Sequence, residues 1–249
     1  MIKKIWITGA SSGIGRALAI KFSNEGWQVA ASARRESLLN DLNKSNPNIH
    51  AFVLDVKDEK SVRNVFQNIL QKFETLDICV FATGIHDPEA EKKLSSEKIR
   101  EIMETNFFGT LNCIMAVNSF FREKKDGHIA IVSSVAGYRG LPAASGYCAS
   151  KAALTSLAES LYFDFKRKNV KVSLISPGFI KTPMTDKNTF PMPMIKSPEY
   201  AAEKIFIGLT KRNSFEIHFP KSFTILLKLL KIMPNWLFFW LVERGVKRF

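Results

Sequence analysis

The sequence predicts an α/β fold, a doubly wound parallel sheet of about seven strands with helices on both faces. Short β-branched runs alternate along the chain with longer segments of helical periodicity. The short runs are almost continuously apolar, which is typical of strands that are buried on both faces. A glycine-rich turn follows the first of these runs and leads into a helical segment. Right-handed crossovers between such elements give a Rossmann-type sheet.

The elements follow in regular order. Strands are predicted over residues 4–8, 28–33, 50–54, 77–81, 128–133, 171–175 and 215–219. Helices are predicted over residues 13–25, 36–44, 58–73, 95–121, 145–168 and 198–210. Ligands of such sheets bind beyond the carboxyl ends of the strands, so functional residues are expected directly after each strand.

The composition is that of a globular protein, with 46% hydrophobic and 24% charged residues in a chain of 249. No linker or repeat divides it, so we expect one domain over residues 1–220 with an extension over 221–249. The three cysteines, Cys79, Cys113 and Cys148, are scattered and indicate neither a disulfide framework nor a metal site. The short N-terminal apolar run does not resemble a signal peptide, and the expected location is the cytoplasm.

The formal net charge of +13 is compatible with nucleic acid, an anionic membrane or an anionic cofactor, or with a merely solvated surface. No nucleic-acid-binding motif accompanies the charge, so no nucleic acid is expected as a partner.

The turn after the first strand predicts a dinucleotide site. Gly9 permits a tight turn, Gly13 allows a pyrophosphate to approach the backbone, and Gly15 lets the helix pack closely on the sheet. The helix that begins there, at Gly13-Ile14-Gly15, presents free N–H groups to the phosphates.

The end of the second strand indicates which dinucleotide binds. An acidic residue there would favour NAD, but the chain has Ala33 followed by Arg34 and Arg35. A guanidinium matches a 2′-phosphate, and Ser11 and Ser12 lie on the glycine turn nearby. The expected cofactor is therefore NADP(H), although two exposed arginines in a loop would give the same pattern.

Four residues predict proton transfer. Tyr147 and Lys151 share one face of a helix, so the ammonium group can stabilise a phenolate. Ser134 follows the fifth strand and can hold a substrate oxygen. Asn106 lies inside a predicted long helix, where it can interrupt the helix and hold a water that reaches Lys151.

Together these residues resemble the short-chain dehydrogenase/reductase family over residues 1 to about 220. The resemblance implies a catalytic tetrad of Asn106, Ser134, Tyr147 and Lys151, with Lys151 also bonding the nicotinamide ribose. It implies further cofactor contacts at Asp55, Val56, Gly84, Pro177, Gly178, Ile180 and Thr182. It also implies a dimer or tetramer built through the helices at 95–121 and 145–168.

One motif departs from the family pattern. Where the family usually has Asn-Asn-Ala-Gly after the fourth strand, this chain has Phe81-Ala82-Thr83-Gly84. Gly84 still allows the backbone to pass close to a cofactor, and Thr83 is expected to replace part of the missing hydrogen bonding.

Two apolar segments bear on the substrate. Residues 182–197 carry methionines, Phe190 and prolines, and are expected either to cover the active site or to pack on the next helix. Residues 221–249 combine leucines, tryptophans and basic residues, which suits a helix on the inner face of a membrane or one buried against protein. A loop that covers the active site and a helix that lies on a membrane would together favour a hydrophobic or lipid-like carbonyl or alcohol substrate.

The predicted function is therefore hydride transfer between NADP(H) and a carbonyl or secondary alcohol. The alternative is a non-catalytic dinucleotide-binding regulatory or scaffold module, which would not need Tyr147.

Overall fold

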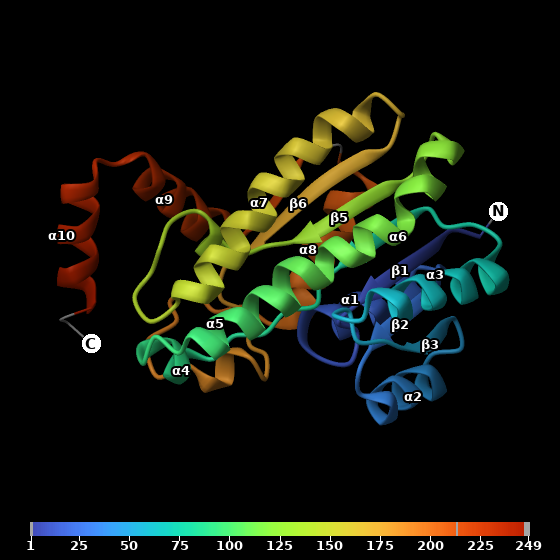
Figure 1. The fold of residues 1–249 in the computed structure, drawn as a ribbon, viewed down its shortest axis with the longest axis horizontal. Helices are drawn as coiled ribbons and strands as arrows, with labels where there is room; N and C mark the ends of the chain where they lie inside the picture. Colours follow the sequence, from blue (N-terminus) through green and yellow to red (C-terminus); the bar gives the residue numbers. More distant parts are fainter. Residues whose placement is uncertain (1, 213, 247–249) are drawn as a thin grey trace.

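The centre of the molecule is one parallel sheet. The computed structural model describes residues 2–212 and 214–246, and its seven strands lie in the order β3-β2-β1-β4-β5-β6-β7 (Figure 1). All neighbouring strands pair in parallel. The strands are β1 (Lys4–Thr8), β2 (Gln28–Ala33), β3 (Ile49–Val53), β4 (Ile78–Phe81), β5 (His128–Val132), β6 (Lys171–Pro177) and β7 (Glu216–Phe219). This confirms the predicted doubly wound sheet.

Helices cover both faces of the sheet, and each face has its own apolar core. Alternate side chains of β1 enter opposite cores: Ile5 and Ile7 face one layer, whereas Trp6 faces the other. The first layer consists of α1 (Gly13–Asn24), α2 (Glu36–Ser45) and α8 (Pro198–Thr210). The second consists of α3 (Glu59–Phe73), α6 (Gly109–Lys124) and α7 (Ser145–Lys166).

The predicted long helical region over 95–121 is present, but it is not one regular α-helix. The structure has α5 (Ser96–Met103), a π-helical turn at Glu104–Phe108, and then α6. A short helix that the sequence did not indicate, α4 (Pro88–Lys92), precedes them. The π-helical turn contains Asn106, whose side chain bonds the backbone of a neighbouring loop. The interruption at Asn106 that the sequence suggested is therefore present.

The C-terminal extension forms α9 (Lys221–Ile232) and α10 (Asn235–Val246), which project from the body of the molecule (Figure 1). Thr224 and Phe238 are buried, and the Arg139 guanidinium lies 4.0 Å from the Phe238 ring centre. Most large apolar side chains of the extension are instead exposed. We call these the apolar surface: Ile225, Leu226, Leu229, Ile232, Trp236, Phe239, Trp240 and Leu241.

None of the helices among the described residues combines the length and apolar character needed to cross a bilayer.

Candidate active site

A cleft of about 470 Å³ lies at the carboxyl ends of the central strands, where the connections after the neighbouring strands β1 and β4 run to opposite faces of the sheet. Every residue that the sequence and the resemblance suggested for the cofactor lines this cleft. They are Gly9, Ser11, Ser12, Gly13, Ile14, Gly15, Arg34, Arg35, Asp55, Val56, Gly84, Tyr147, Lys151, Pro177, Gly178, Ile180 and Thr182. Ser134 lines the cleft as well, whereas Asn106 is fully buried behind it.

The glycine turn has no room for side chains. Gly9 has a φ of +70°, and a Cβ there would lie 2.8 Å from the carbonyl oxygen of Ala82. A Cβ on Gly15 would lie 2.4 Å from the carbonyl oxygen of Gly9, so α1 can start close to the sheet only with glycine. Ser12 precedes α1 without capping it, and the first turn of α1 contains no acidic residue. The free N–H groups of this helix are therefore available to an anion.

The end of β2 adds positive charge beside this turn. Arg35 donates hydrogen bonds to the Ser11 hydroxyl at 2.8 Å and to the Ser12 hydroxyl at 2.7 Å. The side chain of Arg34 is 59% exposed and lies 4.0 Å from the Asp55 carboxylate. Two hydroxyls and two guanidinium groups thus surround the part of the cleft where a dinucleotide ribose would lie, and they suit an added phosphate.

Tyr147 and Lys151 lie one turn apart on α7. Lys151 Nζ is 5.7 Å from the Tyr147 ring centre and donates to the Val132 carbonyl oxygen at 2.9 Å. Burial lowers the pKa of Lys151 to about 8. Burial also raises the pKa of Tyr147 to about 12, and hydrogen bonding with Ser134 partly opposes this. In the cofactor-free protein, Tyr147 therefore holds its proton at neutral pH.

Asn106 ties the loop after β4 to α7. Its Oδ1 accepts from the Ile85 N–H at 2.7 Å, and its Nδ2 donates to the Ile85 carbonyl and to the Ser150 hydroxyl, both at 3.0 Å. Ser150 donates in turn to the carbonyl of Tyr147 at 2.8 Å. Asn106 thus positions the backbone of the active site through direct bonds. The water that the sequence suggested beside it stays a prediction.

The altered motif after β4 keeps the cleft open. The Ala82 N–H donates to the Thr8 hydroxyl at 3.1 Å, which joins the end of β1 to this loop. A Cβ on Gly84 would lie 3.5 Å from both Lys151 Nζ and Asn106 Oδ1. Gly84 therefore lines the cleft within contact distance of two members of the predicted tetrad.

Sequence reasoning missed several residues that line the cleft, above all His86 and Lys187. His86 lies two residues beyond Gly84, and its ring packs on that of Tyr147 with centres 4.5 Å apart. Its position just past the carboxyl end of β4 was the signal that would have identified it. Among the described residues, no group of His, Cys, Asp and Glu is arranged to hold a metal ion.

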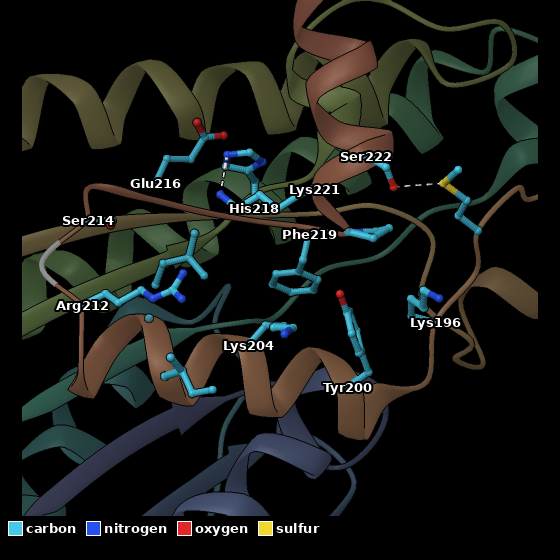
Figure 2. A pocket seen from close by; sticks show the side chains of 15 residues that line it. Lys196, Tyr200, Lys204, Arg212, Ser214, Glu216, His218, Phe219, Lys221 and Ser222 are labelled. Atoms are coloured by element: carbon cyan, nitrogen blue, oxygen red, sulfur yellow. Dashed lines mark hydrogen bonds between the residues drawn. The ribbon is translucent and has the colours of Figure 1, made fainter.

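A second cleft, of about 640 Å³, lies between α8 and β7, and none of the predicted site residues lines it (Figure 2). It is strongly basic, and its cations are Lys196, Lys204, Arg212 and Lys221. Its one carboxylate, that of Glu216, is paired with Lys228 of α9. This basic cleft adjoins the start of the C-terminal extension, because Lys221 and Ser222 belong to α9.

Comparison with known proteins agrees with this geometry. A profile of the short chain dehydrogenase family matches residues 3–193. An uncharacterized oxidoreductase of Myxococcus xanthus is 34% identical over 236 residues, which are 93% of each chain. A 3-oxoacyl-acyl-carrier-protein reductase of Thermotoga maritima is 28% identical and is matched over 84% of this chain and 91% of its own. The chain therefore belongs to the short chain dehydrogenase family of oxidoreductases.

Solved structures show the same fold. A short-chain dehydrogenase from Streptomyces avermitilis superposes with a TM-score of 0.81 at 25% identity, covering 100% of this chain and 98% of its own. The protein ElxO, solved with NADP bound, gives a TM-score of 0.78 at 26% identity, covering 88% of this chain and 98% of its own.

Proposed function

We propose that the protein transfers hydride between NADP(H) and a carbonyl or secondary alcohol, with Tyr147 as the proton donor or acceptor. The observation that carries the proposal is the meeting of Ser134, Tyr147 and Lys151 in the cleft that begins at the glycine turn. The fit of a dinucleotide is supported by the uncapped start of α1 and by the glycine turn before it, where Gly9 and Gly15 leave the backbone free of side chains.

In the reduction, a bound nicotinamide supplies the hydride. Ser134 holds the carbonyl oxygen, and Tyr147 donates its phenolic proton to that oxygen. The ammonium group of Lys151 stabilises the phenolate that forms and bonds the ribose. Asn106 bonds both the loop after β4 and the first turns of α7, and so fixes their relative position. Alcohol oxidation follows the same path in reverse.

The 2′-phosphate of NADP(H) is assigned to Arg34, Arg35, Ser11 and Ser12. Arg35 is already held against the glycine turn by the two serine hydroxyls, so little side-chain entropy remains to be lost on binding. No acidic side chain occupies the position after β2 where a bare ribose would be bonded.

The proposed substrate is hydrophobic. Met184, from the loop over 182–197, lines the same cleft as Tyr147, whereas Phe190 and Met194 of that loop are exposed. An apolar loop that borders the reacting groups on one side and solvent on the other suits a long apolar substrate. The similarity to a 3-oxoacyl reductase is consistent with an acyl-chain carbonyl.

We also propose that the extension rests on an anionic membrane surface. Trp236 and Ile232 of the apolar surface are 71% and 80% exposed. Lys221, Lys228 and Lys231 lie on α9 together with Ile232. The basic cleft continues this positive charge toward α8 (Figure 2). Exposed tryptophans with neighbouring lysines suit the headgroup region of a bilayer.

Vesicle flotation tests the membrane proposal. Trp236→Ser together with Ile232→Ser is expected to abolish binding to vesicles containing phosphatidylserine. Leu38→Ser is the control, because it removes an exposed apolar side chain on α2, at the opposite end of the molecule (Figure 1). Equal flotation of all the variants would contradict the proposal.

A homodimer or homotetramer is proposed through the helices around α5, α6 and α7. Phe108, Met115 and Phe163 are exposed there, by 43%, 59% and 65%. Light scattering of Met115→Asp with Phe163→Asp is expected to show a smaller particle than the wild type, and an unchanged mass would contradict this interface.

The catalytic proposal is tested with Tyr147→Phe. This variant removes only the phenolic hydroxyl, so it should bind NADPH as the wild type does while losing at least about a thousandfold in kcat for carbonyl reduction. Binding is measured by NADPH fluorescence and turnover by absorbance, over a panel of 3-oxoacyl esters and apolar ketones. Cofactor binding by a wild type that reduces none of the panel would favour the non-catalytic alternative.

A further inference from the structure

Two buried ionisable side chains lie beside Tyr147 and have no part in the mechanism above. His86 comes from the loop after β4, and Glu91 comes from α4. Their side chains are 9% and 0% exposed. A buried carboxylate and a buried imidazole are rare unless they are paired, so their arrangement needs an explanation.

Glu91 holds the start of the helix that carries the predicted tetrad. Its Oε2 accepts from the backbone N–H of Gly146 at 2.7 Å and from that of Tyr147 at 3.2 Å. The residue before α7, Ala144, cannot cap the helix with its own side chain. Glu91 therefore supplies this cap from a distant segment, and it does so at Tyr147 itself.

The contact between His86 and Glu91 requires a proton. Nε2 of His86 lies 3.4 Å from Oε1 of Glu91, and neither of these buried atoms has a hydrogen-bond partner among the described residues. The backbone of Ala143 favours the protonated form of the His86 ring and so raises its pKa, which is the effect of a carbonyl oxygen that accepts from the other ring nitrogen. A neutral imidazole would then turn a bare lone pair toward a carboxylate oxygen. One further proton, on Nε2 or on Oε1, converts that repulsion into a hydrogen bond.

We propose that His86 and Glu91 form a positioning pair that shares one proton and holds the Tyr147 ring at the start of α7. The pair acts through two contacts on the same residue. Glu91 fixes the backbone of Tyr147, and His86 packs on its ring, with the planes inclined by 31°. This inference rests on the proposed role of Tyr147 and adds two residues to the machinery that aligns it.

The surroundings favour a single proton on the pair. Burial lowers the pKa of His86 and raises the pKa of Glu91, so both groups resist ionisation. Asp87 acts on both groups from the adjoining loop, and Lys187 acts on His86 from the loop after β6. From α7, Lys151 and Cys148 are the other titratable groups near Tyr147. Loss of the shared proton at high pH would restore the repulsion and release the ring.

The test compares Glu91→Gln with Glu91→Ala. A glutamine can accept from the α7 backbone with its oxygen and donate to His86 with its amide, so it reproduces the protonated pair without a titrating group. Alanine removes both functions. Glu89→Gln is the matched control, since Glu89 lies on the same short helix but is 61% exposed and pairs with Lys92.

We expect Glu91→Gln to keep kcat for NADPH-dependent carbonyl reduction within about threefold of the wild type at neutral pH, and to lose one ionisation from the pH profile of kcat. Glu91→Ala should lose at least about tenfold in kcat, with little change in the KM for NADPH, and Glu89→Gln should match the wild type. Thermal melts of each variant show whether it is folded.

Two results would contradict the proposal that His86 and Glu91 share a proton and position Tyr147. One is a Glu91→Gln profile with the same ionisations as the wild type. The other is a folded Glu91→Gln variant as impaired as Glu91→Ala. A wild type that turns over no carbonyl substrate would instead contradict the proposed function. In that case the pair is judged by nuclear magnetic resonance titration of the His86 ring, whose pKa should change in Glu91→Gln but not in Glu89→Gln.

Discussion

The Arg35 guanidinium donates a hydrogen bond to the Ser12 hydroxyl at 2.7 Å, so the end of β2 is fastened to the residue just before α1. The same guanidinium also bonds Ser11. The glycine turn and the basic residues after β2 are therefore one unit, although 23 positions separate the two bonded residues in the chain. A phosphate held by this unit would contact groups that already have fixed positions.

The first prediction concerns Arg35→Ala. Removing a charge-assisted contact to the 2′-phosphate should weaken NADPH binding by roughly tenfold to a hundredfold while NADH binding changes little. Arg34→Ala should have a smaller effect, because Arg34 lies near the Asp55 carboxylate, whereas Arg35 is bonded to the glycine turn. Fluorescence titration measures both affinities, with Arg63→Ala on α3 as the control. Equal losses for NADPH and NADH would mean that Arg35 only supports the turn.

Most of the fold was predictable because buried parallel strands leave a strong local pattern. The apolar runs located every strand to within one or two residues, and the order of strands and helices predicted the sheet. Helical periodicity also located the long helical region over 95–121, within which the π-helical turn places Asn106 in its tertiary contact with Ile85.

The candidate site was predictable where functional residues follow a strand directly or share one helix face. Tyr147 and Lys151 are four positions apart on one helix, and the glycine turn follows β1, so local spacing was enough. Glu91 was not predictable in this way. Its partners at the start of α7 lie 55 and 56 positions further along the chain, and only the packing of α4 brings them together.

The second prediction concerns the stability of Lys151→Met. Burial lowers the pKa of Lys151 from 10.5 to about 8, so the buried ammonium group reduces the free energy of unfolding at neutral pH. Methionine removes this penalty of about 3 kcal/mol but also the bond to Val132, so a net gain of about 2 kcal/mol is expected at pH 7. Turnover should be lost.

The pH dependence fixes the sign of this effect. The folded pKa is below the unfolded one, so between about pH 8 and 10.5 the unfolded chain holds more protons, and the wild type gains stability as pH rises. The advantage of Lys151→Met should therefore shrink between pH 8 and pH 10 in denaturant unfolding. An advantage that grows with pH would show that Lys151 is stabilised as a cation in the folded protein.

The third prediction concerns Gly15→Ala. The added methyl group would lie 2.4 Å from the carbonyl oxygen of Gly9, which is backbone and cannot move aside cheaply. Unfolding free energy should fall by about 1–3 kcal/mol, and NADPH binding should weaken because the start of α1 shifts. Gly140→Ala is the control, since nothing lies within 4 Å of its added Cβ. Chemical denaturation and fluorescence titration measure the two effects.

The fourth prediction concerns Asn106→Ala. Asn106 is fully buried and joins Ile85 to Ser150, which bonds the carbonyl of Tyr147. Alanine would leave the Ile85 backbone without its side-chain partner, and we expect a loss of about 2 kcal/mol or more in unfolding free energy. Asn118→Ala is the control, because the Asn118 side chain accepts from Arg122, one turn further along α6, and bonds no other element among the described residues.

Activity distinguishes positioning from simple destabilisation. If Asn106 aligns α7 with the loop after β4, kcat should fall at least about tenfold at temperatures where the variant is fully folded, with a smaller change in the KM for NADPH. Ser150→Ala breaks the same connection one step closer to Tyr147, so its effect and that of Asn106→Ala should not add in the double variant. Additive losses would mean that the two residues act on the reaction separately, and that Asn106 does not reach Tyr147 through Ser150.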